Sequence, residues 1–146
     1  MSFVKPPGHL GCTIWLTGLS GSGKTTIARD TKKFLERFNI PVVHLDGDGL
    51  RKGLNSNLGF SKEDRRENIR RVAEVATLFA QSGFISLVSL ISPYAEYRLA
   101  ARNTHESQNI KFFEVYVNTP IEICEVRDPK QLYRIARTNY SKDRSH

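Results

Sequence analysis

The sequence has only two cysteines and no long hydrophobic run, and each shortage narrows the kind of protein it can be. Cys12 and Cys124 lie far apart and form no C-x-x-C pattern, so we expect reduced, packed thiols in a reducing compartment. Residues 1–8 contain no apolar segment typical of a signal peptide, and the longest apolar-rich run, residues 84–91, is too short to cross a bilayer. We therefore expect a cytoplasmic protein without a membrane partner, or a plastid protein whose leader has been removed.

Acidic residues are scarce relative to basic ones. The chain of 146 residues has 22 lysines and arginines against 15 aspartates and glutamates, which gives a net charge of +7. This excess favours acidic partners, either nucleic acid or small polyphosphates, although a solvated basic surface would have the same composition. No aromatic and basic surface stripe is present, so we do not expect a nucleic-acid partner. The length fits one domain.

The most informative segment is Gly18–Thr25, which fits the phosphate-binding P-loop pattern G-x-x-x-x-G-K-[ST]. An apolar, β-branched run over 12–17 predicts a strand before it, and the apolar spacing over 24–38 predicts one face of a helix after it. In that setting backbone N–H groups and the helix N-terminus face phosphate oxygens. We expect Lys24 to neutralise β/γ-phosphate charge and Thr25 to hold Mg²⁺; the alternative is a plain glycine-rich turn.

Apolar runs alternate with helical patterns along the rest of the chain. Strands are expected over 12–17, 41–45, 84–91 and 111–117. Helices are expected over 24–39, 61–82, 95–105 and 129–137, and a further helix has Pro120 in its first position. A short helix and a loop are expected between 50 and 60. This alternation predicts an α/β fold, a P-loop NTPase-like three-layer sandwich with a mainly parallel sheet. Ligands bind such sheets beyond the carboxyl ends of the strands, so the P-loop, the acidic turn at 46–49 and Ser92 should share one crevice.

Two aspartates, Asp46 and Asp48, follow the second expected strand. A carboxylate at this position can orient Mg²⁺ through water, accept the proton of an attacking hydroxyl, or cap its own turn. We expect Asp48 to face the acceptor substrate, because Asp46 can cap the turn instead.

The helix expected over 61–82 places Arg65 near the centre of its apolar stripe and Asn68 on the edge of that stripe. An arginine in line with the core needs an anion, and we expect this anion to be a bound substrate. The alternative is a structural salt bridge with Asp46 or Glu67.

The sequence does not decide the roles of two further residues, Phe60 and Arg51. Phe60 follows a glycine in a polar loop and has no apolar neighbours in the sequence, so it could anchor the core or offer a platform for a base. The sequence does not decide the role of Arg51 either.

A set of motifs in this chain, taken in order, resembles the adenylylsulfate kinase (APS kinase) family. The motifs are Thr13–Thr25, Leu45–Asp48, Arg51–Asn55, Leu58–Ser61, Glu63–Arg65, Glu67–Arg71, Ile91–Tyr94, Arg127–Lys130 and Leu132–Tyr133. The resemblance implies ATP-dependent phosphorylation of adenosine 5′-phosphosulfate (APS) at its 3′-hydroxyl, giving 3′-phosphoadenosine 5′-phosphosulfate (PAPS) and ADP. It also implies ATP and Mg²⁺ as cofactors, a small-molecule substrate and, because the family often dimerises, a homodimer as one assembly.

The resemblance assigns a role to each matching residue. The nucleotide-binding set is Gly18, Leu19, Ser20, Gly21, Ser22, Gly23, Lys24, Thr25, Thr26 and Arg127; the substrate-binding set is Asp46, Asp48, Arg51, Phe60, Arg65, Asn68, Ile91, Ser92 and Lys130. Phe60 would stack on the substrate adenine, and Lys130 would face the nucleotide phosphates. Lys24, Asp48 and Ser92 are the expected catalytic groups, and Thr25 and Asp48 the expected metal ligands.

The chain departs from the family pattern in a few places. Gly49, Gln131 and Leu90 stand where the family usually has Asn, Gly and Phe, and none of them carries an assigned role. Residues 138–146 match neither the family's Lys-Gly-Phe-Thr-Gly lid nor its last strand and helix. We therefore divide the chain into a lead-in over 1–11, a kinase domain over 12–138 and a divergent tail over 139–146, and expect weak substrate binding or lost activity if the protein ends at His146.

Two alternatives to an APS kinase stay open from the sequence. One is a small P-loop kinase that phosphorylates a different hydroxyl. The other is a truncated nucleotide-binding protein without catalysis, which the missing lid would favour.

Overall fold

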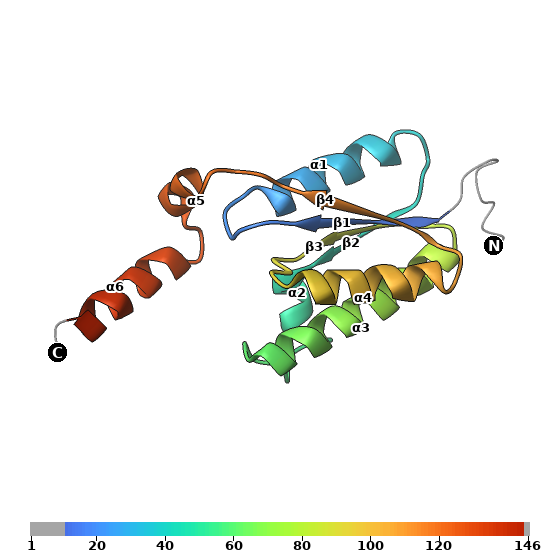
Figure 1. Ribbon diagram of the computed structural model, residues 1–146. Coiled ribbons are helices and arrows are strands. Elements are labelled where there is room, and N and C mark those ends of the chain that lie inside the picture. Colours follow the sequence, from blue (N-terminus) through green and yellow to red (C-terminus); the bar gives the residue numbers. More distant parts are fainter. Residues whose placement is uncertain (1–10, 145–146) are drawn as a thin grey trace.

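Four strands form one parallel sheet in the order β2–β3–β1–β4 (Figure 1). A computed structural model describes residues 11–144. Residues 1–10 of the lead-in predicted over 1–11 therefore lie outside the described residues. The strands are β1 (Cys12–Thr17), β2 (Val42–Asp46), β3 (Ile85–Ser89) and β4 (Lys111–Tyr116). Each lies within one to two residues of its predicted range.

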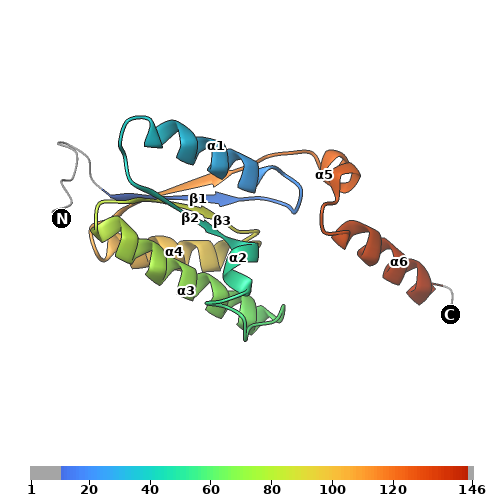
Figure 2. The same cartoon turned by 180° about the vertical axis from the view of Figure 1, so that it is seen from behind.

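Helices cover both faces of this sheet. Helix α1 (Lys24–Glu36) lies on one face, and α3 (Lys62–Gln81) and α4 (Ala95–Glu106) lie on the other; Figure 2 shows the same layers from behind. This arrangement confirms the predicted three-layer α/β sandwich. The carboxyl ends of the strands point toward α2 (Gly47–Arg51) and α5 (Ile121–Arg127), and α6 (Leu132–Arg144) stands apart from the sheet (Figure 1).

Three predicted helix boundaries were wrong, and each has a local cause. The short helix expected within 50–60 begins at Gly47 instead, because Asp46 keeps an extended backbone and the chain turns directly after it. Pro120 precedes α5 as its N-cap and is not its first helical residue. The helix expected over 129–137 begins at Leu132, since the carboxylate of Asp128 accepts hydrogen bonds from the N–H groups of residues 133 and 134.

The core lies mainly between the sheet and α3. Every residue of β3 is buried, as its continuous apolar run predicts for a strand covered on both faces. On α3 the predicted stripe is buried at Ile69, Val72, Ala73, Ala76 and Ala80, while Phe79 is half-buried against Phe84. Ser61 caps this helix by accepting a hydrogen bond from the N–H of Asp64 at 3.1 Å.

Helix α1 differs from its prediction. Its apolar spacing predicts one buried face, yet Ala28 is the buried apolar residue, and Ile27, Phe34 and Phe38 are exposed. Ala28 and Leu35 pack against the sheet with Leu16, Val42, Ile85 and Leu87. The other apolar side chains of this face lie beyond that contact, and no helix or strand among the described residues covers them.

His105 is a fully buried histidine that ties α4 to β1. Its Nδ1–H donates to the carbonyl oxygen of Ala101 at 2.7 Å, and its Nε2 accepts from the hydroxyl of Thr13 at 2.8 Å. These bonds fix the neutral tautomer with the proton on Nδ1. Burial lowers the pKa of His105 below its ordinary value of 6.5.

This lowered pKa predicts acid sensitivity of the fold. Below about pH 6.5 the unfolded chain takes up a proton on His105 while the folded chain does not, so the unfolding free energy should fall by up to about 1.4 kcal/mol per pH unit. Denaturant unfolding between pH 7.5 and 5.5 measures it. In His105→Gln the protein should be less stable at pH 7.5 but should decline less steeply with acid; equal slopes in the two proteins would contradict this account.

Candidate active site

The P-loop leaves β1 and enters α1 through backbone conformations that favour glycine. Gly18, Gly21 and Gly23 all have positive φ, at 153°, 78° and 105°. A Cβ on Gly21 would lie 3.0 Å from the carbonyl oxygen of Cys124, so α5 packs closely over the loop. The glycines therefore serve both the loop's curvature and its close approach to α5.

Lys24 is buried at the start of α1. Its Nζ donates to the carbonyl oxygens of Gly18 and Leu19, both at 2.8 Å. Burial, and then the charge of Lys130, lower the pKa of Lys24 to about 8. The Lys24 ammonium is therefore poorly hydrated and close to a second cation, Lys130, and a bound polyphosphate would stabilise both charges.

Asp46 is the carboxylate that connects the strand ends. Its Oδ1 accepts hydrogen bonds from Thr25 Oγ1 and Ser89 Oγ, both at 2.9 Å. Burial acts to raise the pKa of Asp46, but these two hydrogen bonds and the nearby His44 outweigh it, so that the pKa is lowered. The Asp46 carboxylate thus bonds Thr25 and Ser89, and a backbone hydrogen bond from Gly49 in its own turn also helps to lower its pKa.

His44 extends this hydrogen-bonded chain. Its Nε2 lies 2.8 Å from Ser89 Oγ. Because the Ser89 hydroxyl donates to Asp46, His44 must donate its Nε2–H to Ser89. Burial lowers the pKa of His44, which favours the neutral imidazole in this role. This geometry makes His44 a structural histidine that orients Ser89.

Asp48 points to a different partner. It forms an ion pair with Lys130 at 2.6 Å between Oδ1 and Nζ, and both side chains are largely exposed. This contact joins α2 to the segment between α5 and α6. The structure thus brings Lys130 and Asp48 together, as their predicted shared site requires, and places Asp46, not Asp48, against the Thr25 hydroxyl.

Three side chains from the α5–α6 region hold the outer side of the P-loop. Arg127 Nη1 donates to the carbonyl oxygen of Gly21 at 3.1 Å, Tyr133 Oη to that of Ser20 at 2.8 Å, and Thr119 Oγ1 to that of Ser22 at 2.7 Å. Arg127 was expected here from the family resemblance. Thr119 and Tyr133 were not assigned to the site, because no periodicity in the sequence signals a contact across about 100 residues.

Phe60 and two arginines form a second part of the site. The Phe60 side chain is 69% exposed, so the core-anchor alternative is wrong. The guanidinium carbons of Arg51 and Arg65 lie 4.3 and 5.6 Å from its ring centroid. Arg65 Nε donates to the Phe60 carbonyl oxygen at 3.0 Å, and Arg51 Nη1 donates to those of Leu58 and Gly59. We name Arg51, Phe60 and Arg65 the Arg–Phe–Arg platform.

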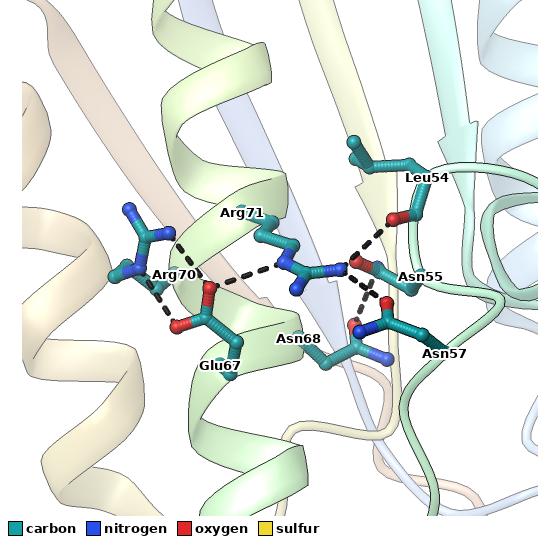
Figure 3. A network of polar contacts seen from close by, with 7 residues as sticks. All are labelled: Leu54, Asn55, Asn57, Glu67, Asn68, Arg70 and Arg71. Atoms are coloured by element: carbon teal, nitrogen blue, oxygen red, sulfur yellow. Dashed lines mark hydrogen bonds and ion pairs between the residues drawn. The ribbon is translucent and has the colours of Figure 1, made fainter.

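The salt-bridge alternative for Arg65 is not realised among residues 11–144. Glu67 instead bonds Arg70 and Arg71, which lower its pKa to about 2 (Figure 3). Asp46 is committed to Thr25 and Ser89. Burial, followed by the charge of Arg65, lowers the pKa of Arg51, so the two guanidinium groups repel each other across the platform.

Asn68, Ile91 and Ser92 complete the predicted set. Asn68 is buried on α3 beside Asn55 (Figure 3). The carbonyl oxygen of Ile91 accepts from Thr17 Oγ1 at 2.7 Å. Ser92 has φ 45° and is buried, and its Oγ accepts from Trp15 Nε1 at 3.0 Å, so its hydroxyl is engaged by the core side of the sheet.

Two absences apply to the part of the chain that the structure describes. No three His, Cys, Asp or Glu side chains gather closely enough to hold a metal ion by themselves. No helix there is long and apolar enough to span a membrane.

The fold and the P-loop motif together define an α/β protein of the P-loop NTPase-like class. Residues 10–143 match the family described as Adenylylsulphate kinase. The chain belongs to this family.

Known relatives agree with this assignment. The chain is 53% identical over 133 residues to the adenylyl-sulfate kinase of Saccharomyces cerevisiae, covering 91% of this chain and 66% of that protein. It is 54% identical over 127 residues to adenylyl-sulfate kinase 3 of Arabidopsis thaliana, covering 87% and 60%. The chain therefore spans a little under two thirds of the length of these relatives.

A solved structure supports the same fold. The APS kinase CysC of Mycobacterium tuberculosis, in complex with AMPPNP and APS, superposes with a TM-score of 0.87 at 51% identity. The alignment covers 90% of this chain and 76% of that one.

The close packing at Gly21 predicts a stability effect. Gly21→Ala puts a methyl group at φ 78° and 3.0 Å from the Cys124 carbonyl oxygen, so we expect a loss of about 1–3 kcal/mol of unfolding free energy and weaker binding of an ATP analogue. Denaturant unfolding and calorimetry measure the two effects. Gly53→Ala is the matched control, because nothing lies within 4 Å of the added Cβ, and it should change stability by less than about 0.5 kcal/mol. Equal effects of the two substitutions would contradict the packing argument.

Proposed function

We propose that this protein transfers the γ-phosphoryl group of ATP to the 3′-hydroxyl of adenosine 5′-phosphosulfate, forming PAPS and ADP. The observation that carries the proposal is the exposed Phe60 ring beside two guanidinium groups, on a fold that already has a P-loop. A flat apolar face flanked by cations fits an acceptor with an aromatic base and anionic groups. A sugar or a simple alcohol would use neither feature.

The donor half follows from the P-loop. Backbone N–H groups of the loop and the N-terminus of α1 would bind the ATP phosphates, and Lys24 would exchange its carbonyl partners for β/γ-phosphate oxygens. Arg127 lies above the loop at Gly21 and would add positive charge there. These groups stabilise charge on the transferred phosphoryl group more than they bind the ground state.

The residues around Thr25 fit a magnesium ion. The Thr25 hydroxyl and the Asp46 carboxylate are 2.9 Å apart, and oxygen ligands from one or two side chains together with substrate phosphates are what Mg²⁺ uses in kinases. When bound, the ion neutralises charge on the β- and γ-phosphates. Thr25 would hold the magnesium ion directly, and Asp48 is the second ligand predicted from the sequence. Asp46 also lies beside the Thr25 hydroxyl.

The acceptor half would bind APS on the Arg–Phe–Arg platform. Phe60 would stack on adenine, Arg51 and Arg65 would pair with the phosphosulfate, and Asn68 would donate a hydrogen bond. Asp48 would accept the 3′-hydroxyl proton as the 3′-oxygen forms a bond to the γ-phosphorus. The bond from that phosphorus to the β–γ bridging oxygen breaks, and ADP leaves.

Turnover with APS tests the proposal. Purified protein with ATP and Mg²⁺ should release ADP in a coupled assay when APS is added, and not with gluconate or adenosine. Lys24→Ala should lower kcat by about 100-fold or more, because it removes the charge that stabilises the transferred phosphoryl group. ATP binding without ADP release in the presence of APS would overturn the proposal and favour a non-catalytic nucleotide-binding protein.

The platform makes a separate prediction for Arg65. Arg65→Ala should raise KM for APS by about tenfold or more, with KM for ATP nearly unchanged, because it removes a charge-assisted contact to the acceptor. Initial-rate kinetics with each substrate varied in turn would measure this. Arg66→Ala, on the exposed side of the same helix turn, is the control and should leave both constants within about twofold. An unchanged KM for APS in Arg65→Ala would refute the anion role.

The homodimer stays a prediction from the family resemblance, and the cytoplasmic or plastid location stays a prediction from the cysteines and the apolar runs of the sequence. Light scattering on the purified protein tests the first of them.

A further inference from the structure

Asn55 is a fully buried polar residue that the proposed reaction does not use. Its backbone N–H donates to the carbonyl oxygen of Leu50 at 2.8 Å, and its own carbonyl oxygen accepts from the N–H of Leu58 at 3.0 Å. Its side-chain Nδ2 donates to Asn68 Oδ1 at 3.1 Å (Figure 3). Asn55 therefore links the loop after α2 to the first half of α3.

The Asn55 side chain is not explained by stability. Its Oδ1 is buried and has no hydrogen-bond partner among the described residues. An unpaired buried carbonyl oxygen destabilises a fold, so an apolar residue of the same size would suit the core better. A buried polar side chain with an unpaired oxygen calls for a role beyond packing.

The side-chain amide of Asn68 indicates what this role is. Its Oδ1 accepts a hydrogen bond from Asn55, while its Nδ2 has no partner among the side chains described over residues 11–139, and Figure 3 shows this nitrogen turned away from Asn55. Asn68 follows Arg65 by three residues on α3, so the two side chains lie on neighbouring positions of one helix face. The unpaired N–H₂ group is thus a donor next to the Arg–Phe–Arg platform.

The loop itself has a second attachment to α3 that does not need Asn55. Arg71, held by Glu67 at 3.1 Å, donates from Nη1 to the carbonyl oxygen of Leu54 at 3.0 Å and to Asn57 Oδ1 at 2.8 Å (Figure 3). These bonds fix the loop on both sides of Asn55. Loss of the Asn55 side chain should therefore leave the loop in place and affect mainly the Asn68 amide.

We propose that Asn55 is a positioning residue that fixes the orientation of the Asn68 amide, so that its N–H₂ group and not its oxygen faces the anionic acceptor. With Nδ2 of Asn55 as the donor, the Asn68 oxygen is the acceptor, and this pairing leaves the Asn68 N–H₂ group for the anionic acceptor. Without it, the amide is free to rotate and present a carbonyl oxygen to an anion. This inference rests on the proposed function, because it concerns the acceptor of that reaction.

Kinetics of Asn55 variants test the assignment. Asn55→Leu keeps the branched shape of the side chain with a larger volume, Asn55→Ala truncates it, and both lose the donor. Each should raise KM for APS by about tenfold, with kcat and KM for ATP within about twofold of wild type. Asn68→Ala should raise KM for APS similarly, and Asn55→Leu should then add nothing in the Asn68→Ala background. Ser56→Ala, at the exposed neighbouring position, is the control and should leave all constants unchanged.

The outcomes separate this inference from the proposed function. An Asn55→Leu variant that leaves KM for APS unchanged, that raises KM for ATP equally, or that acts additively with Asn68→Ala overturns the positioning role. A lower melting temperature alone, with wild-type KM, does the same, since it shows a merely structural residue. No turnover of APS by the wild-type protein overturns the proposed function, and with it this inference.

Discussion

The hydrogen bonds that converge on Asp46 hold the candidate site together. Asp46 and Ser89 are register partners on the parallel strands β2 and β3, so both side chains reach the same end of the sheet. Thr25 reaches the same carboxylate from the first turn of α1, which fixes the P-loop relative to both strands. Each hydrogen bond to a charged acceptor contributes on the order of 1.5–3 kcal/mol, and these bonds outweigh the burial that would otherwise favour a protonated carboxyl. The ionised Asp46 is therefore a structural centre as well as a candidate neighbour of the metal.

The Arg–Phe–Arg platform follows a different physical logic. Here the free protein holds two guanidinium groups around an exposed ring, and neither forms an ion pair with a carboxylate among the described residues. Backbone carbonyl oxygens of the loop orient both arginines, so their positions are set before a ligand arrives. Because like charges repel, an anion placed between them gains more than it would at a neutralised surface. The platform is thus pre-organised for an anionic aromatic acceptor, and the loop that Asn55 and Arg71 anchor is what maintains it.

The sequence predicted what depends on local pattern and missed what depends on distant contacts. The P-loop between β1 and α1, the long helix α3 and the buried strand β3 all follow from motif and apolar spacing, and the structure confirms them. The placement of Arg65 and Asn68 followed from helical period alone. The carboxylate that meets Thr25 did not, because strand register, which sequence spacing does not show, brings Asp46 to Ser89. The exposed stripe of α1 and the contacts of Thr119 and Tyr133 with the P-loop likewise depend on which surfaces the sheet covers.

The ion pair between Lys130 and Asp48 connects the two halves of the proposed site. It is solvent-exposed, and exposed ion pairs contribute about 0–1 kcal/mol, so it holds the two side chains together only weakly. ATP phosphates carry several negative charges and would compete for Lys130 effectively at that energy. Release from Lys130 would leave the Asp48 carboxylate free to accept a proton from the acceptor hydroxyl. In this arrangement ATP binding would itself release the carboxylate that accepts the proton during the transfer. A weak ion pair between Lys130 and Asp48 permits this release, and a strong one would oppose it.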